Sequence, residues 1–115
     1  MVTLYHNPRC SKSREALALL QARGIEPAIV RYLDTPPDAA ALRQLLRQLG
    51  LPARELLRHK EEEYQALGLD DPKLDDEALI AAMVAHPKLI ERPIAIQGRR
   101  AIIGRPPEKI LELLK

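Results

Sequence analysis

The only cysteine of this 115-residue chain, Cys10, stands among polar and basic residues near the N-terminus. It follows the apolar run Val2 to Tyr5 and a short loop, and a helix-like run begins directly after it at Ser11. The first turn of a helix leaves backbone N–H groups unpaired and carries a partial positive charge. Such a position lowers the pKa of a thiol, and the thiolate is the nucleophilic form of cysteine. We therefore predict that Cys10 is a nucleophile.

The neighbours of the thiol favour the same chemistry. Three basic residues lie close to it in the sequence, namely Arg9, Lys12 and Arg14. His6 would tune the thiolate or transfer a proton, and the alternative for it is a structural hydrogen bond at a strand end. N–H groups that stabilise a thiolate also form a cradle for an oxyanion, to which Ser13 adds a hydroxyl donor. One loop would thus hold a nucleophile and an anionic substrate, whereas a merely structural Cys10 would be buried as a small hydrophobic residue.

Three further arginines border apolar segments, namely Arg58, Arg92 and Arg105. A planar guanidinium donates two parallel hydrogen bonds to an oxyanion, so several of them near Cys10 would bind a tetrahedral dianion and stabilise its charge during reaction. Spacing in the sequence does not show whether they converge. For each arginine the alternative is a solvated surface charge.

Length and composition predict a single domain over residues 1–115. The hydrophobic content of 46% is typical of a globular protein, and the three aromatic residues are all tyrosine. A net charge of +2 with interleaved signs, and so few aromatic residues, do not favour nucleic-acid binding. No stretch has about 18 uninterrupted apolar residues, as a membrane span needs. We expect a monomeric cytoplasmic protein with neither a nucleic-acid nor a membrane partner.

The cysteine and histidine pattern restricts the chemistry further. One cysteine forms no internal disulfide, so an oxidised or covalently modified Cys10 must be resolved by a thiol of another molecule. The three histidines are scattered without the close spacing of metal ligands. We expect no metal site and no tightly bound cofactor.

Strand-like and helix-like patterns alternate in the part of the chain that would position Cys10. Strands are predicted over residues 2–5 and 28–32, and a helix that ends at Gly24 is predicted between them over residues 11–23. This order is typical of a right-handed βαβ unit with parallel strands. A hairpin is predicted from the β-like runs 93–96 and 100–103.

Helical patterns fill the rest of the chain. A helix is predicted over residues 38–49, with Asp38 as its N-cap and Gly50 at its end. Residues 53–86 form short helical patterns, and a last helix opens at Pro106-Pro107. The fold class is therefore α/β, with a mixed four-stranded sheet, flanking helices and a helical insertion at about residues 38–86.

At ten consecutive residues, Tyr5-His6-Asn7-Pro8-Arg9-Cys10-Ser11-Lys12-Ser13-Arg14, the chain resembles the active-site loop of the glutaredoxin-linked arsenate reductase family. Residues 54–58, 86–94 and 104–108 are similar to the later blocks of that family, in the same order. The resemblance covers essentially the whole chain. It implies a thioredoxin-like fold with a helical insertion, and it suggests a cis peptide bond at Arg92-Pro93.

The resemblance also implies an activity, the reduction of arsenate to arsenite. Cys10 would attack the arsenic, and His6 matches the family's histidine near the nucleophile. Arg58, Arg92 and Arg105 match the three family arginines that hold the oxyanion and later intermediates. Glutathione, as external reductant, would form a mixed adduct with the Cys10-bound arsenic, glutaredoxin would reduce this adduct, and arsenite would leave.

Two other functions stay open. A related branch of the family binds RNA polymerase as a redox-responsive regulator, commonly with a Cys-x-x-Cys switch, whereas here Ser13 stands three residues after Cys10. A general monothiol oxidoreductase would reduce small mixed disulfides with glutathione, without need for the three arginines.

Overall fold

The structure is a computed structural model that describes residues 1–114, and the chain divides into two compact units. The first unit comprises residues 1–35 and the C-terminal segment that begins at Arg92, and the second comprises residues 36–91. The predicted insertion at about residues 38–86 falls within the second unit. The single-domain organisation stays a prediction.

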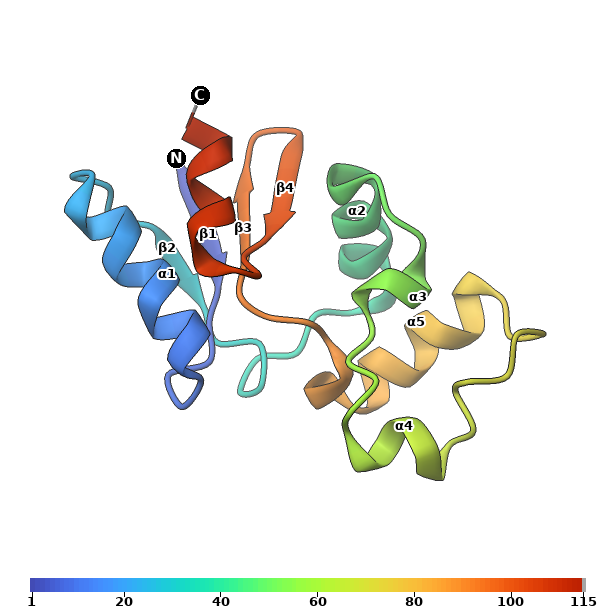
Figure 1. The fold of residues 1–115 in the computed structure, drawn as a ribbon. Helices are drawn as coiled ribbons and strands as arrows, with labels where there is room; N and C mark the ends of the chain where they lie inside the picture. Colours follow the sequence, from blue (N-terminus) through green and yellow to red (C-terminus); the bar gives the residue numbers. More distant parts are fainter. Residues whose placement is uncertain (115) are drawn as a thin grey trace. The chain divides into compact units, whose positions relative to one another are not determined.

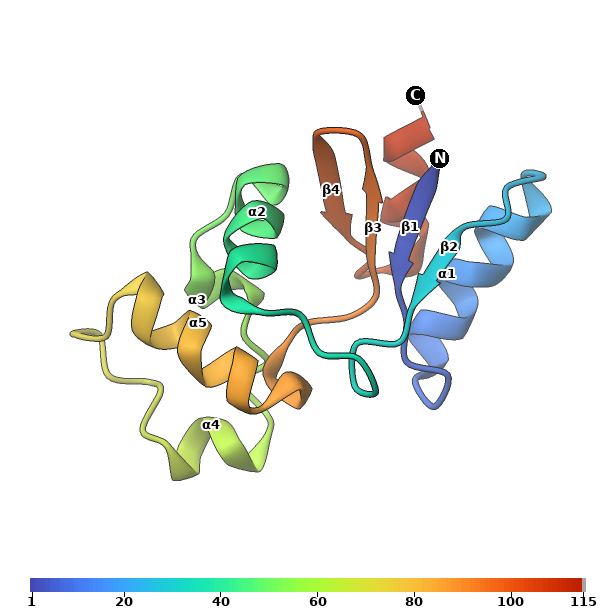
Figure 2. The same cartoon turned by 180° about the vertical axis from the view of Figure 1, so that it is seen from behind.

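A mixed four-stranded sheet with strand order β2-β1-β3-β4 forms the centre of the first unit (Figures 1 and 2). Strand β1 (Val2–Tyr5) runs parallel to β2 (Ala28–Val30) and antiparallel to β3 (Ile94–Gln97). Strand β4 (Arg100–Ile103) pairs antiparallel with β3. This arrangement confirms the predicted thioredoxin-like fold class.

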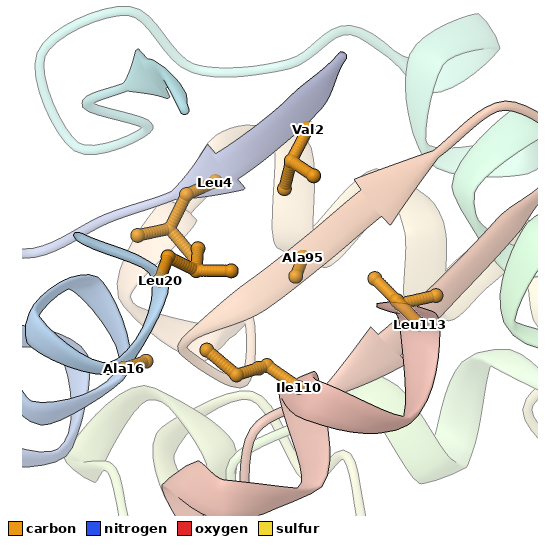
Figure 3. Close-up of a cluster of buried hydrophobic side chains, with 7 residues drawn as sticks. All are labelled: Val2, Leu4, Ala16, Leu20, Ala95, Ile110 and Leu113. Atoms are coloured by element: carbon orange, nitrogen blue, oxygen red, sulfur yellow. The ribbon is translucent and has the colours of Figure 1, made fainter. Parts of the chain in front are cut away.

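Two helices cover the same face of this sheet and contact each other, α1 (Ser11–Ala22) and the C-terminal 3-10 helix η2 (Pro107–Leu114) (Figures 1 and 2). On α1 the fully buried Ala16 and Leu20 are four residues apart and so lie on one side of the helix. They join a cluster of buried side chains from the two strands at the sheet centre and from η2 (Figure 3), namely Val2, Leu4, Ala95, Ile110 and Leu113. This packing fixes the start of α1, where Cys10 stands, against the sheet.

Strand β2 is shorter than predicted, because it ends at Val30 instead of residue 32. The chain turns directly after it, where the N–H groups of Asp34 and Thr35 both donate to the Arg31 carbonyl. Helix α1 ends within a residue of its predicted end, and Gly24 follows it with a φ of 75°. A positive φ favours glycine, which has no Cβ to clash with the backbone.

The second unit holds four α-helices and a short 3-10 helix, as the helical pattern predicted, at Ala39–Leu49 (α2), Ala53–Leu56 (α3), Glu62–Ala66 (α4), Asp76–Ala85 (α5) and Pro87–Leu89 (η1). The Asp38 side chain caps α2 by accepting from the Ala41 N–H at 2.8 Å, as predicted. Helix α5 contacts α2, α3 and η1. Residues 1–114 contain no helix that is long and apolar enough to span a membrane.

The peptide bond between Arg92 and Pro93 is cis, as the resemblance suggested, and the bond between Arg105 and Pro106 is cis as well. The hairpin of β3 and β4 closes through Gly98 and Arg99, with a φ of 62° at Gly98. Glycine at the first of two loop residues is typical of a type II′ hairpin turn. The hairpin thus places Arg92 and Arg105 at its open end, one before β3 and one after β4.

Candidate active site

The loop between β1 and α1 is held by Asn7. Its carbonyl accepts from the Cys10 N–H at 2.9 Å, and its side-chain oxygen accepts from the Arg9 N–H at 3.0 Å. Pro8 occupies the second position of this four-residue turn, where its fixed φ is favourable. The Arg14 guanidinium fastens the same loop, because it donates to the Pro8 carbonyl at 2.8 Å. Asn7 is not among the predicted site residues, although an Asn-Pro pair after a strand is a recognisable turn signal.

Cys10 is the N-cap residue of α1. Its backbone is extended (φ −95°, ψ 123°), and its carbonyl accepts from the Arg14 N–H at 3.0 Å as the helix begins. The half-buried thiol makes no capping hydrogen bond of ordinary geometry. A neutral thiol is a weak hydrogen-bond acceptor, whereas the negative charge of a thiolate makes it a stronger one. The unpaired N–H groups of the first turn therefore favour the thiolate form of Cys10.

The pKa of the Cys10 thiol lies below its ordinary value. Burial raises this pKa, but the backbone N–H of Ser13, the guanidinium of Arg92 and the backbone N–H of Lys12 together lower it by more. Arg92 acts both as a hydrogen-bond donor to the sulfur and as a positive charge. Each of these groups stabilises the thiolate relative to the thiol. The site therefore favours an ionised nucleophile.

A buried hydrogen-bond network lies beneath the loop, between His6 and Ser13. The two side chains are joined by a 2.6 Å hydrogen bond between His6 Nδ1 and Ser13 Oγ, and the Asn7 N–H donates to the same Ser13 oxygen at 3.0 Å. The network is satisfied when Ser13 donates its proton to the unprotonated Nδ1 of a neutral imidazole. The His6 N–H also donates to the Val30 carbonyl at 2.9 Å, which fastens the residue to the end of β2.

The pKa of His6 is lowered, first by burial and then by the positive charges of Arg31 and Arg14. A neutral imidazole at pH 7 agrees with its role as acceptor from Ser13. His6 therefore supplies no positive charge to the thiolate. The bond to Ser13 agrees with the alternative role of His6, a structural hydrogen bond at a strand end. A role of His6 in proton transfer stays a prediction.

Ser13 was expected to offer its hydroxyl to the substrate, and the structure gives the hydroxyl a different place. The residue is 0% exposed, and its oxygen is engaged by both His6 and Asn7. A hydroxyl held in this way is not available to an oxyanion in solution. Ser13 contributes to the site through its backbone N–H, which acts on the sulfur of Cys10.

Arg92 and Arg105 belong to the same unit as Cys10 and are joined to each other. Arg105 Nε donates to the Arg92 carbonyl at 2.9 Å, and both residues are half-buried. The Arg92 guanidinium is one of the groups that lower the pKa of the Cys10 thiol. The structure thus brings together five of the six predicted site residues, Cys10, His6, Ser13, Arg92 and Arg105, within the first unit.

Arg58, the sixth, belongs to the second unit. Its side chain is 18% exposed and lies near two carboxylates, with Nη1 at 3.4 Å from Glu61 Oε1 and Nε at 3.8 Å from Glu91 Oε1. Its backbone N–H donates to the Leu89 carbonyl at 2.7 Å, next to the bridge that joins Leu57 to Ile90. The convergence of Arg58 with the other arginines stays a prediction.

A cavity of about 210 Å³ adjoins the active-site loop and is lined by His6, Asn7, Pro8, Arg9, Arg31, Leu33 and Asp34. Arg31 and Asp34 form an exposed ion pair there at 3.1 Å. No sequence signal marked Arg31, because its influence on His6 arises only where β2 lies beside β1. Among residues 1–114, no group of histidine, cysteine and carboxylate side chains is arranged to hold a metal ion.

The chain matches known proteins over nearly its whole length. The family model described as the ArsC family matches residues 5–113. The chain is 59% identical over 114 residues to the uncharacterized protein YfgD of Escherichia coli (strain K12), covering 98% of this chain and 96% of the relative. It is 50% identical over 114 residues to an arsenate reductase of Neisseria meningitidis, covering 98% and 97%. A solved structure of an arsenate reductase from Vibrio cholerae matches with a TM-score of 0.94 and 54% identity, covering 96% of this chain and 95% of that one.

Proposed function

This chain belongs to the ArsC family, and on that premise we propose that it reduces arsenate to arsenite with Cys10 as the nucleophile. The observation that carries the proposal is the position of Cys10 as the N-cap residue of α1, where backbone N–H groups of the first turn and the Arg92 guanidinium lower the pKa of its thiol. A thiolate attacks an electrophilic centre without first losing a proton. The names and the full-length similarity of the Neisseria and Vibrio proteins support arsenate as the substrate.

In the first step, the Cys10 sulfur would form a bond to arsenic(V), and one arsenate oxygen would take up protons and leave as water. The sulfur loses its negative charge as this bond forms. The donors that stabilised the thiolate, the Ser13 N–H and the Arg92 guanidinium, would then be free to stabilise the negative oxygens on arsenic. The same set of donors thus serves the nucleophile before the step and the oxyanion after it.

The reductant would come from outside the chain, because Cys10 has no second cysteine to resolve it. The thiol of glutathione would displace another oxygen as water, which leaves arsenic bound to both sulfurs. A glutaredoxin thiolate would attack the glutathione sulfur to form a mixed disulfide, and the electron pair of the broken sulfur–arsenic bond would stay on arsenic. Arsenic is thereby reduced from arsenic(V) to arsenic(III), and water would release arsenite and the Cys10 thiol.

The remaining predicted residues would act around this centre. Arg58 and Arg105 would hold the oxyanion and the later intermediates, together with Arg92. A neutral His6 would exchange a proton rather than provide a charge. We place the reaction in the cytoplasm, because glutathione keeps thiols reduced there.

The proposal is tested by arsenate-dependent consumption of NADPH in an assay coupled through glutathione, glutathione reductase and glutaredoxin. Turnover should require arsenate, glutathione and glutaredoxin together, and it should fall when any one of the three is left out. No turnover by folded, reduced protein with several glutaredoxins would refute the arsenate assignment. Reduction of a small glutathione mixed disulfide by that same protein would then indicate a general monothiol oxidoreductase, and capture of RNA polymerase would indicate the regulator.

A further inference from the structure

We infer that Arg105 and Gly104 position Arg92 toward Cys10, so that Arg105 acts on the thiolate through Arg92. This inference deepens the proposed function, on which the importance of Arg92 for the reaction rests. It assigns Arg105 a positioning role in addition to the contact with an oxyanion that the family resemblance implies.

Two hydrogen bonds join the segment after β4 to the segment before β3. The Gly104 N–H donates to the Pro93 carbonyl at 2.8 Å, and Arg105 Nε donates to the Arg92 carbonyl at 2.9 Å. Both lie outside the strands, before the first residue of β3 and after the last residue of β4. The two segments are therefore joined past the strands first by a backbone hydrogen bond and then by the Arg105 side chain.

The backbone ladder ends at Pro93 and Gly104, and a side chain makes the next contact. The Arg105 N–H donates to the Ile103 carbonyl at 3.0 Å and so does not reach the Arg92 carbonyl. The Arg105 guanidinium reaches the Arg92 carbonyl instead and supplies a charge-assisted hydrogen bond.

Gly104 lets the two segments approach closely. The residue is buried, and a Cβ built on it would lie 2.9 Å from Pro93 Cγ and 2.9 Å from Ile110 Cγ2. Both distances are shorter than van der Waals contact, so a side chain here would displace either the proline ring or the core residue behind it. Pro93 is itself buried, and it follows Arg92 directly in the chain.

The positions of Arg92 and Pro93 matter because the Arg92 side chain is one of the groups that lower the pKa of Cys10. A charge-assisted hydrogen bond depends steeply on distance and direction. Loss of the bond from Arg105, or a shift of Pro93 away from Gly104, releases the backbone from which the Arg92 guanidinium projects. The thiolate then loses part of its stabilisation although Arg92 is still present.

The test is a pH titration of the Cys10 thiolate, followed by its ultraviolet absorbance, in four proteins: wild type, Arg105→Ala, Arg92→Ala and the double variant. Arg105→Ala should move the midpoint to higher pH in the wild-type background and should have no effect in the Arg92→Ala background. Gly104→Ala should shift the midpoint in the same direction as Arg105→Ala, and Arg105→Lys should restore part of the loss. Arg100→Ala is the matched control, because it removes a positive charge from β4 at an exposed position and should leave the midpoint unchanged.

An equal shift by Arg105→Ala in both backgrounds would show direct action on the thiolate and would overturn the inference, as would no shift in the wild-type background. Far-ultraviolet circular dichroism of each variant confirms that the titrated protein is folded. The titration needs no arsenate, so it gives its answer even if the proposed activity fails.

Discussion

Replacing Ser13 with alanine should lower the free energy of unfolding by about 2 kcal/mol, with its two buried hydrogen bonds as the main cause. The hydroxyl is bound to His6 at 2.6 Å and to the Asn7 N–H at 3.0 Å, and Ser13 is 0% exposed. Its removal leaves two partners with unsatisfied polar atoms, each at a cost of about 1–3 kcal/mol. Alanine returns roughly 0.5 kcal/mol through its higher helix propensity. The lower part of the range applies because His6 lies at the protein surface on one side, with 8% exposure.

Urea unfolding at pH 7.5, followed by circular dichroism, measures this loss. Ser11→Ala is the matched control, because it makes the same substitution two residues earlier on the same helix at an exposed position. A loss of less than about 0.5 kcal/mol for Ser13→Ala, as is usual for surface substitutions, would refute the reasoning. So would a raised KM for substrate with unchanged stability, since that result would assign the hydroxyl to substrate binding.

Two further predictions concern Cys10 and His6. Arg92→Ala should raise the pKa of Cys10, because it removes a hydrogen bond and a positive charge from the thiolate. The pH profile of alkylation by iodoacetamide should therefore move to higher pH. An unchanged profile would contradict the assigned role of Arg92. Wild-type stability should decrease as pH falls below about 6.5, because the pKa of His6 is lower in the folded protein and the unfolded chain therefore binds the proton first. Urea unfolding at pH 7.5 and pH 5.5 should show a smaller decrease for His6→Asn than for the wild type, and an equal decrease in both proteins would assign the effect to other groups.

Features specified by neighbouring residues could be predicted from the sequence. The start of α1 at Ser11, the N-cap at Asp38 and the end of α2 at Gly50 follow from local rules for helix termini, and the structure has all three. The position of Cys10 at the start of a helix follows from the same local rules. Such signals are read within a few residues, before any tertiary contact is known.

Features that depend on contacts distant in the sequence could not be predicted in this way. Helical spacing places Ser13 on the same side of α1 as Ala16 and Leu20, but its bonds to His6 and to the Asn7 N–H depend on how the loop folds back over α1. The bond from Arg105 to the Arg92 carbonyl depends on the register of a hairpin that lies between them. The ion pairs of Arg58 with Glu61 and Glu91 likewise require the folded second unit.

The source of the positive charge beside Cys10 also depends on contacts distant in the sequence. The sequence places Arg14 close to the thiol, but in the structure its guanidinium donates to the Pro8 carbonyl. Arg92, which is 82 positions from Cys10 in the sequence, supplies the side-chain charge that lowers the pKa of the thiol. An arginine side chain therefore does lower the pKa of Cys10, but it is one that is distant in the sequence and not one from the same loop.

The central claim, that Cys10 carries out arsenate reduction, is tested most directly by the initial rate of the coupled NADPH assay for wild type and Cys10→Ser at equal concentration. Serine keeps the size and the loop hydrogen bonds of the backbone, but its hydroxyl is not ionised at neutral pH. The account predicts arsenate-dependent turnover by the wild type and a rate for Cys10→Ser that is no higher than the rate without protein. Equal turnover by the two proteins would contradict it.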